Sequence, residues 1–393
     1  MLLIIFWFCV AVVLYTYLGY GILIYFLARW RPYKAKVSLH QISTTADLPE
    51  ITLFIAAYNE ADIIPAKMEN CLALDYPADR LHILWVIDGS TDASKDILQN
   101  YPSVQIVHSA ERRGKTAAIN HGIQSVDTPL VVFSDANCML NREALRRIAF
   151  QFADESIGCV SGEKRIAFEE EDTISSKGEG LYWEYESFLK KMDFQYYSAV
   201  GAAGELYAIR TAFFVPMRED TLLDDFMLSM EIAKNGYRIA YTPDAYAVER
   251  GSLNMEEESK RKKRIAAGGW QSMIWLWPLL NIFKYGKLSF QYISHRVLRW
   301  SITPFALFAL LPLSLILAQC DKTSLNVFYV ILVFQIVFYI CAAVGYLKKD
   351  NTRVSKIFYV PYYFIFMNIN VLLGVHYLLR KRPAGIWEKS KRK

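Results

Sequence analysis

Acidic and amide side chains follow three short apolar runs at matching positions. These side chains are Glu60, Asp88, Asp135 and Asn137. One such carboxylate is usually a turn former or a helix cap, and Asp92 has the position of a cap. Carboxylates at corresponding positions after three runs instead indicate a catalytic or binding site.

The apolar runs that precede these side chains must position them. They are β-branched or aromatic segments at residues 51–57, 81–88, 104–109, 129–136 and 158–166. The polar segments between them are long enough for crossover helices, so residues 50–250 are predicted to form an α/β domain with a mostly parallel sheet flanked by helices. In such sheets ligands bind beyond the carboxyl ends of the strands. No G-x-G-x-x-G sequence follows the first run, which argues against a dinucleotide enzyme.

Uncharged apolar segments flank this domain. Residues 2–28 carry no charge and exceed the roughly 20 residues that span a bilayer. No basic region precedes them and no small-residue cleavage site follows, so they are expected to form a retained transmembrane anchor. Three further segments, about 301–319, 326–347 and 357–379, form a predicted C-terminal transmembrane region over 301–379. None has an acidic or basic interior residue, which argues against a transporter or channel.

Basic residues predict the orientation of the chain. Those that follow the first segment are Arg29, Arg31, Lys34 and Lys36. By the positive-inside rule they place the α/β domain in the cytoplasm, in an integral protein of the inner or plasma membrane. Four crossings from an outside N-terminus would put the basic tail 380–393 outside, against the same rule. Either one segment, such as the last one with Pro361, is re-entrant, or the rule is overridden.

The stretch 254–300 combines basic and aromatic residues. A basic cluster at 260–264 precedes the Trp-rich segment 270–283. This combination predicts amphipathic helices at the cytoplasmic interface, where lysines meet anionic lipid and aromatic rings lie at headgroup depth. The alternative is an ordinary buried helix with a charged end. Interfacial helices would hold the site against the membrane, where a lipid acceptor is found.

Composition narrows the class of protein further. The six cysteines are scattered without C-x-x-C or ligand-like spacing, which argues against a disulfide framework or a zinc site. The net charge of +5 is modest for 393 residues, and no nucleic-acid partner is expected.

Seven motifs occur in order along the chain: AAYNE (56–60), VIDGSTD (86–92), RRGKTAAIN (112–120), SDAN (134–137), YWEYE (182–186), GAAGELYAIR (201–210) and LLDDFMLSMEIAKNGYRIAYTP (222–243). Together they resemble the family 2 glycosyltransferases, in particular the membrane-bound branch of chitin, cellulose, hyaluronan and poly-N-acetylglucosamine synthases. The resemblance covers nearly the whole chain. It implies a GT-A-like fold and an inverting hexosyltransferase that uses a nucleotide sugar, with UDP as the expected nucleotide, and a lipid-linked or glycan acceptor.

The resemblance also implies roles for individual residues. Nucleotide-sugar-binding residues would be Ala57, Tyr58 and Glu60 around the uridine, Asp88 near the base or ribose, and Lys115, Asp135 and Arg264 near the diphosphate. Asp225, beside Asp224, would be the catalytic base that activates the acceptor hydroxyl. Without the resemblance, Arg112, Arg113 and Lys115 would be a solvated basic turn, and the two aspartates would be acids that favour a helix N-terminus.

Two positions depart from the pattern of the family. The D-x-D motif is Asp135-Ala-Asn137, so the expected Mg²⁺ or Mn²⁺ site has one carboxylate and one amide, and metal dependence is still expected. The Q-x-x-R-W motif of processive synthases becomes Arg261-Lys-Lys-Arg264-Ile265, and Trp270 comes five residues too late. This favours one or few sugar additions. A processive synthase with a variant motif, or a catalytically inactive scaffold, are the alternatives.

Overall fold

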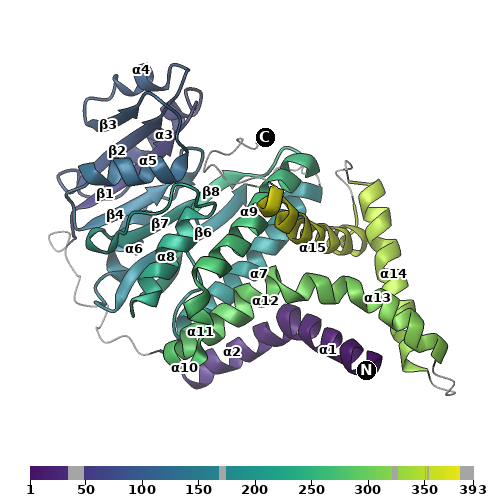
Figure 1. The fold of residues 1–393 in the computed structure, drawn as a ribbon. Coiled ribbons are helices and arrows are strands. Elements are labelled where there is room, and N and C mark those ends of the chain that lie inside the picture. The colour runs from purple at the N-terminus through teal and green to yellow at the C-terminus, as the bar shows by residue number, and fades with distance from the viewer. Residues whose placement is uncertain (34–47, 168–173, 321–325, 350, 352–353, 381–393) are drawn as a thin grey trace.

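The computed structural model describes residues 1–33, 48–167, 174–320, 326–349, 351 and 354–380. Within these ranges an α/β domain carries long apolar helices that project from one side (Figure 1). The strands are β1 (Ile51–Ala57), β2 (Leu81–Asp88), β3 (Val104–Ser109), β4 (Leu130–Ser134), β5 (Met139–Leu140), β6 (Ile157–Ala167), β7 (Leu206–Arg210) and β8 (Arg238–Arg250).

In the described part of the chain these strands form one eight-stranded sheet in the order β3-β2-β1-β4-β7-β6-β8-β5. The first four are parallel neighbours, and β6 is parallel to β8. β7 runs antiparallel to both β4 and β6, and the short β5 is antiparallel to β8. The predicted GT-A-like sheet is therefore confirmed, and it is mixed because strands outside the five apolar runs join it in the opposite direction.

Alternate residues of each strand supply two apolar cores. On β1, Leu53 and Ile55 belong to one core and Phe54 to the other. Helices α3 (Ile64–Leu72), α4 (Ser94–Leu98) and α6 (Ala144–Gln151) contribute to the first core, and α5 (Lys115–Gly122) and α8 (Asp224–Lys234) to the second. Short 3₁₀ turns, η4 (Ile123–Ser125) and η5 (Thr211–Phe213), follow α5 and β7. Burial on both faces explains why the strands read as continuous apolar runs.

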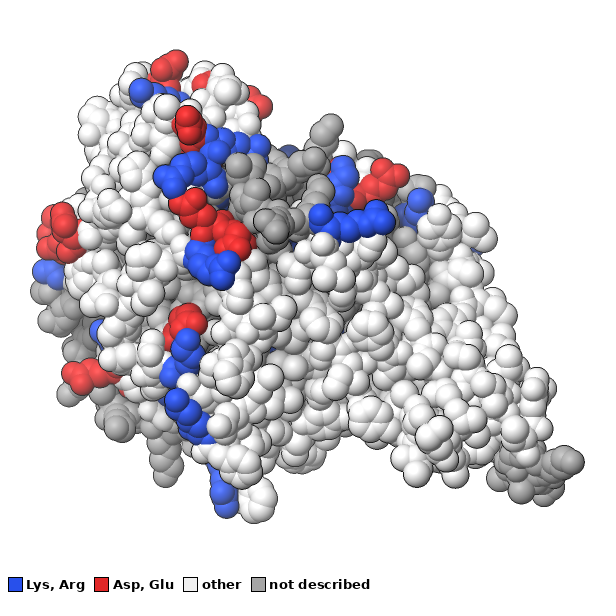
Figure 2. All heavy atoms as spheres, viewed as in Figure 1, with Lys and Arg blue, Asp and Glu red and all other residues white. Residues whose placement is uncertain are grey.

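Four helices in the described residues are long and apolar enough to cross a membrane. They are α1–α2 (Leu2–Leu14 and Tyr20–Trp30, joined by the π-helical turn η1, Tyr15–Gly19), α13 (Ile302–Cys320), α14 (Val327–Leu347) and α15 (Lys356–Arg380). Figure 2 shows charged side chains over the α/β domain and a nearly uncharged surface on the projecting helices. The chain is a membrane protein, as predicted. The predicted tail lies outside the described residues, apart from Arg380 at the end of α15.

A second group of helices connects the sheet to the apolar helices. It comprises α7 (Ile174–Tyr196), α9 (Met255–Trp275), η6 (Trp277–Leu280), α10 (Ile282–Tyr285), α11 (Lys287–Tyr292), the π-helical turn η7 (Ile293–Val297) and α12 (Leu298–Trp300). Part of the interfacial interpretation is wrong here, because Arg261 and Lys262 are buried and face carboxylates of the domain instead of lipid. Trp277 and Phe283 are 68% and 98% exposed, which keeps an interfacial role for the region around α10 as a prediction.

Helix α15 packs along α9 and not only along its apolar neighbours (Figure 1). A Cβ atom on Gly374 would lie 2.4 Å from the Cβ of Ala266, so the two helices touch where Gly374 has no side chain. The Tyr363 hydroxyl donates to Glu258 (2.9 Å), and the Ser259 hydroxyl donates to Asn370 (2.7 Å). Pro361 lies inside α15 without interrupting it, so the last apolar segment is one continuous helix. This helix is attached to α9 by the contacts above.

Candidate active site

Every site residue predicted from the sequence lines one cavity of about 470 Å³. These residues are Ala57, Tyr58, Glu60, Asp88, Lys115, Asp135, Asn137, Asp224, Asp225 and Arg264. They come from the carboxyl ends of β1, β2 and β4 and from the first turns of α5 and α8, with one residue from α9. Parallel strands end at the same edge of a sheet, which explains why positions far apart in the sequence meet there.

The loop after β1 is fastened to the loop after β2. Asn59 has a positive φ of 51°, and its side-chain carbonyl accepts a hydrogen bond from the backbone of Thr91 (2.8 Å). The backbone of Ala61 donates to Asp92 (3.0 Å), whose other oxygen accepts from Ser94. These contacts hold Tyr58 at the rim of the cavity. The guanidinium of Arg112 lies 3.7 Å from the centre of the Tyr58 ring and adds a cation beside an aromatic face.

Asp88 fixes the basic loop that leads into α5. Its two carboxylate oxygens accept hydrogen bonds from the backbone amides of Arg113 (2.9 Å) and Gly114 (2.7 Å). The next residue, Gly89, has φ +63°, and a Cβ there would lie 2.3 Å from the backbone nitrogen of Arg112. The basic loop therefore packs directly against Gly89. Asp88 positions Lys115 by binding the backbone amides of the two residues that precede it.

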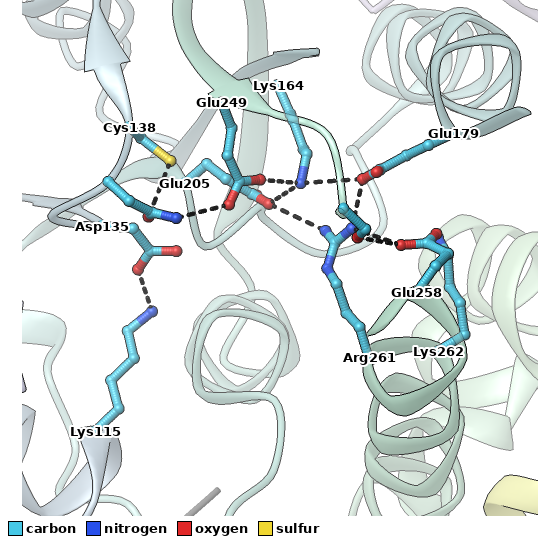
Figure 3. A network of polar contacts seen from close by, with 12 residues as sticks. Lys115, Asp135, Cys138, Lys164, Glu179, Glu205, Glu249, Glu258, Arg261 and Lys262 are labelled. Carbon is cyan, nitrogen blue, oxygen red and sulfur yellow. Dashed lines mark hydrogen bonds and ion pairs between the residues drawn. The ribbon is translucent and has the colours of Figure 1, made fainter. Parts of the chain in front are cut away.

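Lys115 lies among three aspartates. Its ammonium donates to Asp135 (2.6 Å), as Figure 3 shows, and lies 3.6 Å from the carboxylate of Asp224. Burial alone would lower the pKa of Lys115, but the charges of Asp135, Asp224 and Asp225 raise it above its usual value. Lys115 is thus held as a cation that partly neutralises the carboxylates when no other cation is present.

Asp224 and Asp225 form the first turn of α8. Asp224 is buried, and its Oδ2 has no hydrogen-bond partner among the described residues. Burial, and then the charge of Asp224, raise the pKa of Asp225 to about 7, although Lys115 opposes the shift. A carboxyl group with a pKa near neutrality can exchange protons with a hydroxyl group at the pH of the cell.

Asp135 and Asn137 present one carboxylate and one amide to the cavity. The amide nitrogen of Asn137 donates to Glu249 on β8 (3.1 Å), so the side-chain carbonyl is the oxygen available to a cation. No group of three or more His, Cys, Asp or Glu gathers as a metal site in the described ranges. Mg²⁺ commonly takes only one or two protein ligands when nucleotide phosphates supply the rest. The two side chains therefore fit a cation that arrives with a diphosphate.

The variant Q-x-x-R-W segment lies on α9 and faces the cavity with Arg264 and Ile265. The pKa of Arg264 is lowered by burial and by the charge of Arg261. The charges of Asp224, Asp135 and Asp225 oppose this shift, so Arg264 lies near these carboxylates. Trp270 does not line the cavity, but Trp300 of α12 does, and it packs edge-on against Phe226 (5.2 Å between ring centroids).

A buried ion network behind the cavity was not predicted from the sequence. Lys164 lies 2.5 Å from both Glu205 and Glu249 and 3.6 Å from Glu179, while Arg261 contacts Glu179 (Figure 3). Glu258 continues the network to Lys262 (3.3 Å) and to Tyr363 on α15. The motif 201–210 contains Glu205 and was the one available signal. Nothing in the apolar runs distinguishes Lys164 or Glu249 from solvent-facing strand residues.

A mixed α/β sheet with carboxylates and cations at its strand ends, joined to apolar helices that could span a membrane, is the arrangement of a GT-A-like fold in a membrane protein. Residues 52–214 match the model for Glycosyl transferase family 2.

Two curated relatives share 26% identity with this chain. One is the beta-monoglucosyldiacylglycerol synthase of Synechocystis sp., matched over 267 residues, 64% of this chain and 54% of the relative. The other is the poly-beta-1,6-N-acetyl-D-glucosamine synthase of Staphylococcus aureus, matched over 239 residues, 58% of this chain and 56% of the relative. The chain therefore matches about half the length of these relatives.

One solved structure is similar over nearly its whole length. It is the mannosyltransferase PcManGT from Pyrobaculum calidifontis in complex with GDP-Man and Mn²⁺, with a TM-score of 0.69 and 22% identity. The similarity covers 97% of this chain and 99% of that chain. At this identity it establishes the shared fold, including the helices outside residues 52–214.

Proposed function

We propose that the chain transfers a hexose from a nucleotide sugar, with a UDP-sugar as the first candidate, to a lipid-linked or glycan acceptor. The observation that carries this proposal is the cavity in which Asp225, Lys115, Arg264 and Asp135 meet. The names of the relatives, a glycolipid synthase and a polysaccharide synthase, support the same reaction class. The basic residues at 29–36 support a cytoplasmic catalytic domain in the inner or plasma membrane.

The donor binds with its nucleoside at the rim and its diphosphate inward. Ala57, Tyr58 and Glu60 line the nucleoside side of the cavity, with Asp88 beneath the basic loop. Lys115 and Arg264 contribute positive charge to the diphosphate. A divalent cation, Mg²⁺ or Mn²⁺, held by Asp135 and Asn137 would supply further charge to the leaving group, and the Mn²⁺ in PcManGT supports this assignment.

The transfer is a single displacement at the anomeric carbon. The acceptor oxygen forms a bond to this carbon while the bond between the carbon and the phosphate oxygen breaks, which inverts the configuration. Asp225 takes the proton of the acceptor hydroxyl, and the nucleoside diphosphate leaves with the bonding electron pair. The raised pKa of Asp225 suits a general base at neutral pH.

A processive synthase is the second candidate, and Trp300 is the observation that favours it. Its ring lines the cavity next to Phe226 and offers an aromatic face to an acceptor sugar in place of the missing motif tryptophan. Ile265 at the motif position favours one or few additions instead. The length of the product separates these two candidates.

The first experiment is a nucleotide-release assay on the protein in detergent with Mn²⁺ and native lipid extract. A panel of UDP- and GDP-sugars is tested with the native protein, with Asp225→Asn, and with Asp220→Asn as a matched control in an exposed ion pair. We expect release from one donor, a loss of about 10²–10⁴-fold in Asp225→Asn, no loss in the control, and loss of release in excess chelator. Equal release by Asp225→Asn and native protein would refute the role of this base. Absence of both release and nucleotide binding would favour the scaffold alternative.

A further inference from the structure

The cavity continues beyond Asp225 toward the apolar helices. Its far wall is formed by Tyr17 of η1, Leu181 and Tyr185 of α7, and Phe364, Met367 and Val371 of α15. Leu181 is 39% exposed, so this end of the cavity is bordered by a side chain that reaches the surface. A molecule that reaches Asp225 from this side would lie against helices that are themselves apolar enough for a membrane.

Three cations line this part of the cavity around Glu186. Arg296 and Arg299 both form ion pairs with Glu186, the second at 3.0 Å. Lys190 lies one helical turn after Glu186 on α7, with its ammonium 5.7 Å from the centre of the Trp183 ring. All three are largely buried, at 8%, 8% and 3% exposed.

These cations keep hydrogen-bond donors that the protein does not use. Lys190 forms no hydrogen bond and no ion pair with any residue that the structure describes. Arg299 uses Nη1 on Glu186, while its Nε and Nη2 have no partner in the described part of the chain. Arg296 uses Nε on the carbonyl of Val200 and Nη2 on Glu186, and no described residue accepts from its Nη1. Buried donors without partners are costly, which points to a ligand that completes them.

The surrounding carboxylates do not balance the three charges. Glu186 is shared by both arginines and by His295, and the other carboxylates whose charges act on Lys190 are Glu163 and Glu205. Glu163 already accepts hydrogen bonds from Ser187 and Tyr241, and Glu205 is paired with Lys164. Burial lowers the pKa of Lys190, as expected for an ammonium that lacks a close counterion.

This cationic group is distinct from the one assigned to the donor diphosphate. The charges that act on Lys115 are those of Asp135, Asp224 and Asp225, whereas Lys190 is acted on by Glu186 and Arg296. Lys190 and Asp225 line the same cavity, and both lie close enough to the thiol of Cys159 for their charges to act on its pKa. The group thus lies next to the proposed base, on the side of the apolar helices.

We infer that Lys190, Arg296 and Arg299 bind the phosphate group of a lipid acceptor whose chain lies along α15. The role of this lipid as the sugar acceptor rests on the proposed function. Charge-assisted hydrogen bonds from guanidinium and ammonium groups suit a phosphate, and the apolar wall suits an acyl or prenyl chain. A neutral lipid or a free glycan would leave the buried donors unused.

The test measures binding of short-chain fluorescent phosphatidate and of the matching diacylglycerol to the full chain in neutral detergent. Lys190→Met removes the ammonium, Lys190→Arg keeps the charge, and Lys191→Met is the matched control on the exposed side of the same helix. We expect phosphatidate to bind at least tenfold tighter than diacylglycerol, and Lys190→Met to remove this preference. Lys190→Arg and Lys191→Met should keep it. Because Lys190 has no hydrogen-bond or ion-pair partner in the described structure, the melting temperature of Lys190→Met should be unchanged or higher.

Three results would overturn the inference. They are equal binding of the two lipids by the native protein, full phosphatidate affinity in Lys190→Met, and displacement of phosphatidate by millimolar inorganic phosphate, which would indicate a site for free anions. UDP and GDP binding is measured on the same samples. A native protein that binds phosphatidate but no nucleotide would count against the proposed function alone, whereas a parallel loss of nucleotide and lipid binding in Lys190→Met would assign Lys190 to the donor.

Discussion

Four side chains, from the start of α5, the start of α8 and the end of β4, concentrate charge in the cavity. Asp224, Asp225 and Asp135 bring three carboxyl groups around one ammonium, that of Lys115. Like charges at short range disfavour full ionisation, and the group with the raised pKa is Asp225. The carboxyl group of Asp225 therefore exchanges its proton near neutrality, while Lys115 forms its closest ion pair with Asp135.

The activity should therefore rise with pH through about 7. Asp225 acts as a base only when it is ionised, and its pKa is raised from the ordinary carboxyl range to about 7, so the rate falls as pH drops below that value. The measurement is kcat/KM for nucleotide release between pH 5.5 and 8.5, since this ratio reports groups of the free enzyme. Asp220→Asn is the control, because Asp220 lies in an exposed ion pair with Arg218 and not in this cluster. A rate that is constant from pH 5.5 upward would contradict the assignment of Asp225 as the base.

Single residues were predicted where a motif supplied them. All ten predicted site residues line the cavity. Those at the ends of β1, β2 and β4 meet because parallel strands end at the same edge of a sheet, whereas those on α5, α8 and α9 were predicted from the motifs alone. The hydrogen bonds of Asp88 to the basic loop were not predictable, since they depend on how closely that loop passes over Gly89. Lys190 and Arg299 also escaped prediction, because a buried cation on a helix has the same sequence appearance as an exposed one.

Helices α9 and α15 form the element that joins the catalytic domain to the apolar helices. α9 carries Arg261 and Arg264 on the side of the sheet and touches α15 at Ala266. α15 carries aromatic and aliphatic side chains into the cavity. The shape of the cavity therefore depends on how closely these two helices approach each other.

Substitution of Gly374 should separate the two helices. In Gly374→Leu the new side chain meets the Cβ of Ala266 and the backbone of Ala267, and overpacking of this kind costs about 1–3 kcal/mol. We expect a lower melting temperature in detergent together with a loss of transfer activity. Leu373→Phe, which adds volume at the exposed neighbouring position, is the control and should change neither. Native stability in Gly374→Leu would show that α15 is not held against α9 as described.

The elements themselves were predicted unevenly. Apolar composition predicted β1 to β4, β6 and the four long helices. The antiparallel β7 and the long β8 are not among the predicted apolar runs, because their residues fall in or beside the motifs at 201–210 and 222–243. The basic cluster at 260–264 was predicted to face lipid. Within it, Arg261 and Lys262 are instead buried against carboxylates. Arg261 contacts Glu179 and Glu205 of other elements, and Lys262 contacts Glu258 of the same helix.

At the scale of the whole molecule, the contacts of α15 bear on the topology of the chain. Two hydrogen bonds, from Tyr363 to Glu258 and from Ser259 to Asn370, attach α15 to α9 along much of its length. A helix fixed in this way stays on the side of that domain. Three crossings, by α1–α2, α13 and α14, would then leave both the catalytic domain and the basic tail in the cytoplasm, in agreement with the positive-inside rule.

Cysteine labelling tests this topology. Cys320, exposed at the end of α13, should react with a membrane-impermeant maleimide in intact bacterial spheroplasts. Leu379→Cys in a Cys320→Ser background should react only after permeabilisation, because Leu379 lies at the exposed end of α15 on the cytoplasmic side. Labelling of Leu379→Cys in intact spheroplasts would mean that α15 crosses the membrane and that the charge rule is overridden.

The ion network behind the cavity limits how this protein can be dissected. A fragment cut after β8, at the boundary that the sequence alone suggests for a water-soluble catalytic unit, would keep Lys164 with Glu179, Glu205 and Glu249 but lose Arg261. Removing one partner from a buried charge network typically costs about 3–5 kcal/mol, comparable to much of the stability of a domain. Simplified soluble versions for screening or crystallisation would therefore have to retain α9, and with it the apolar surface that α15 covers.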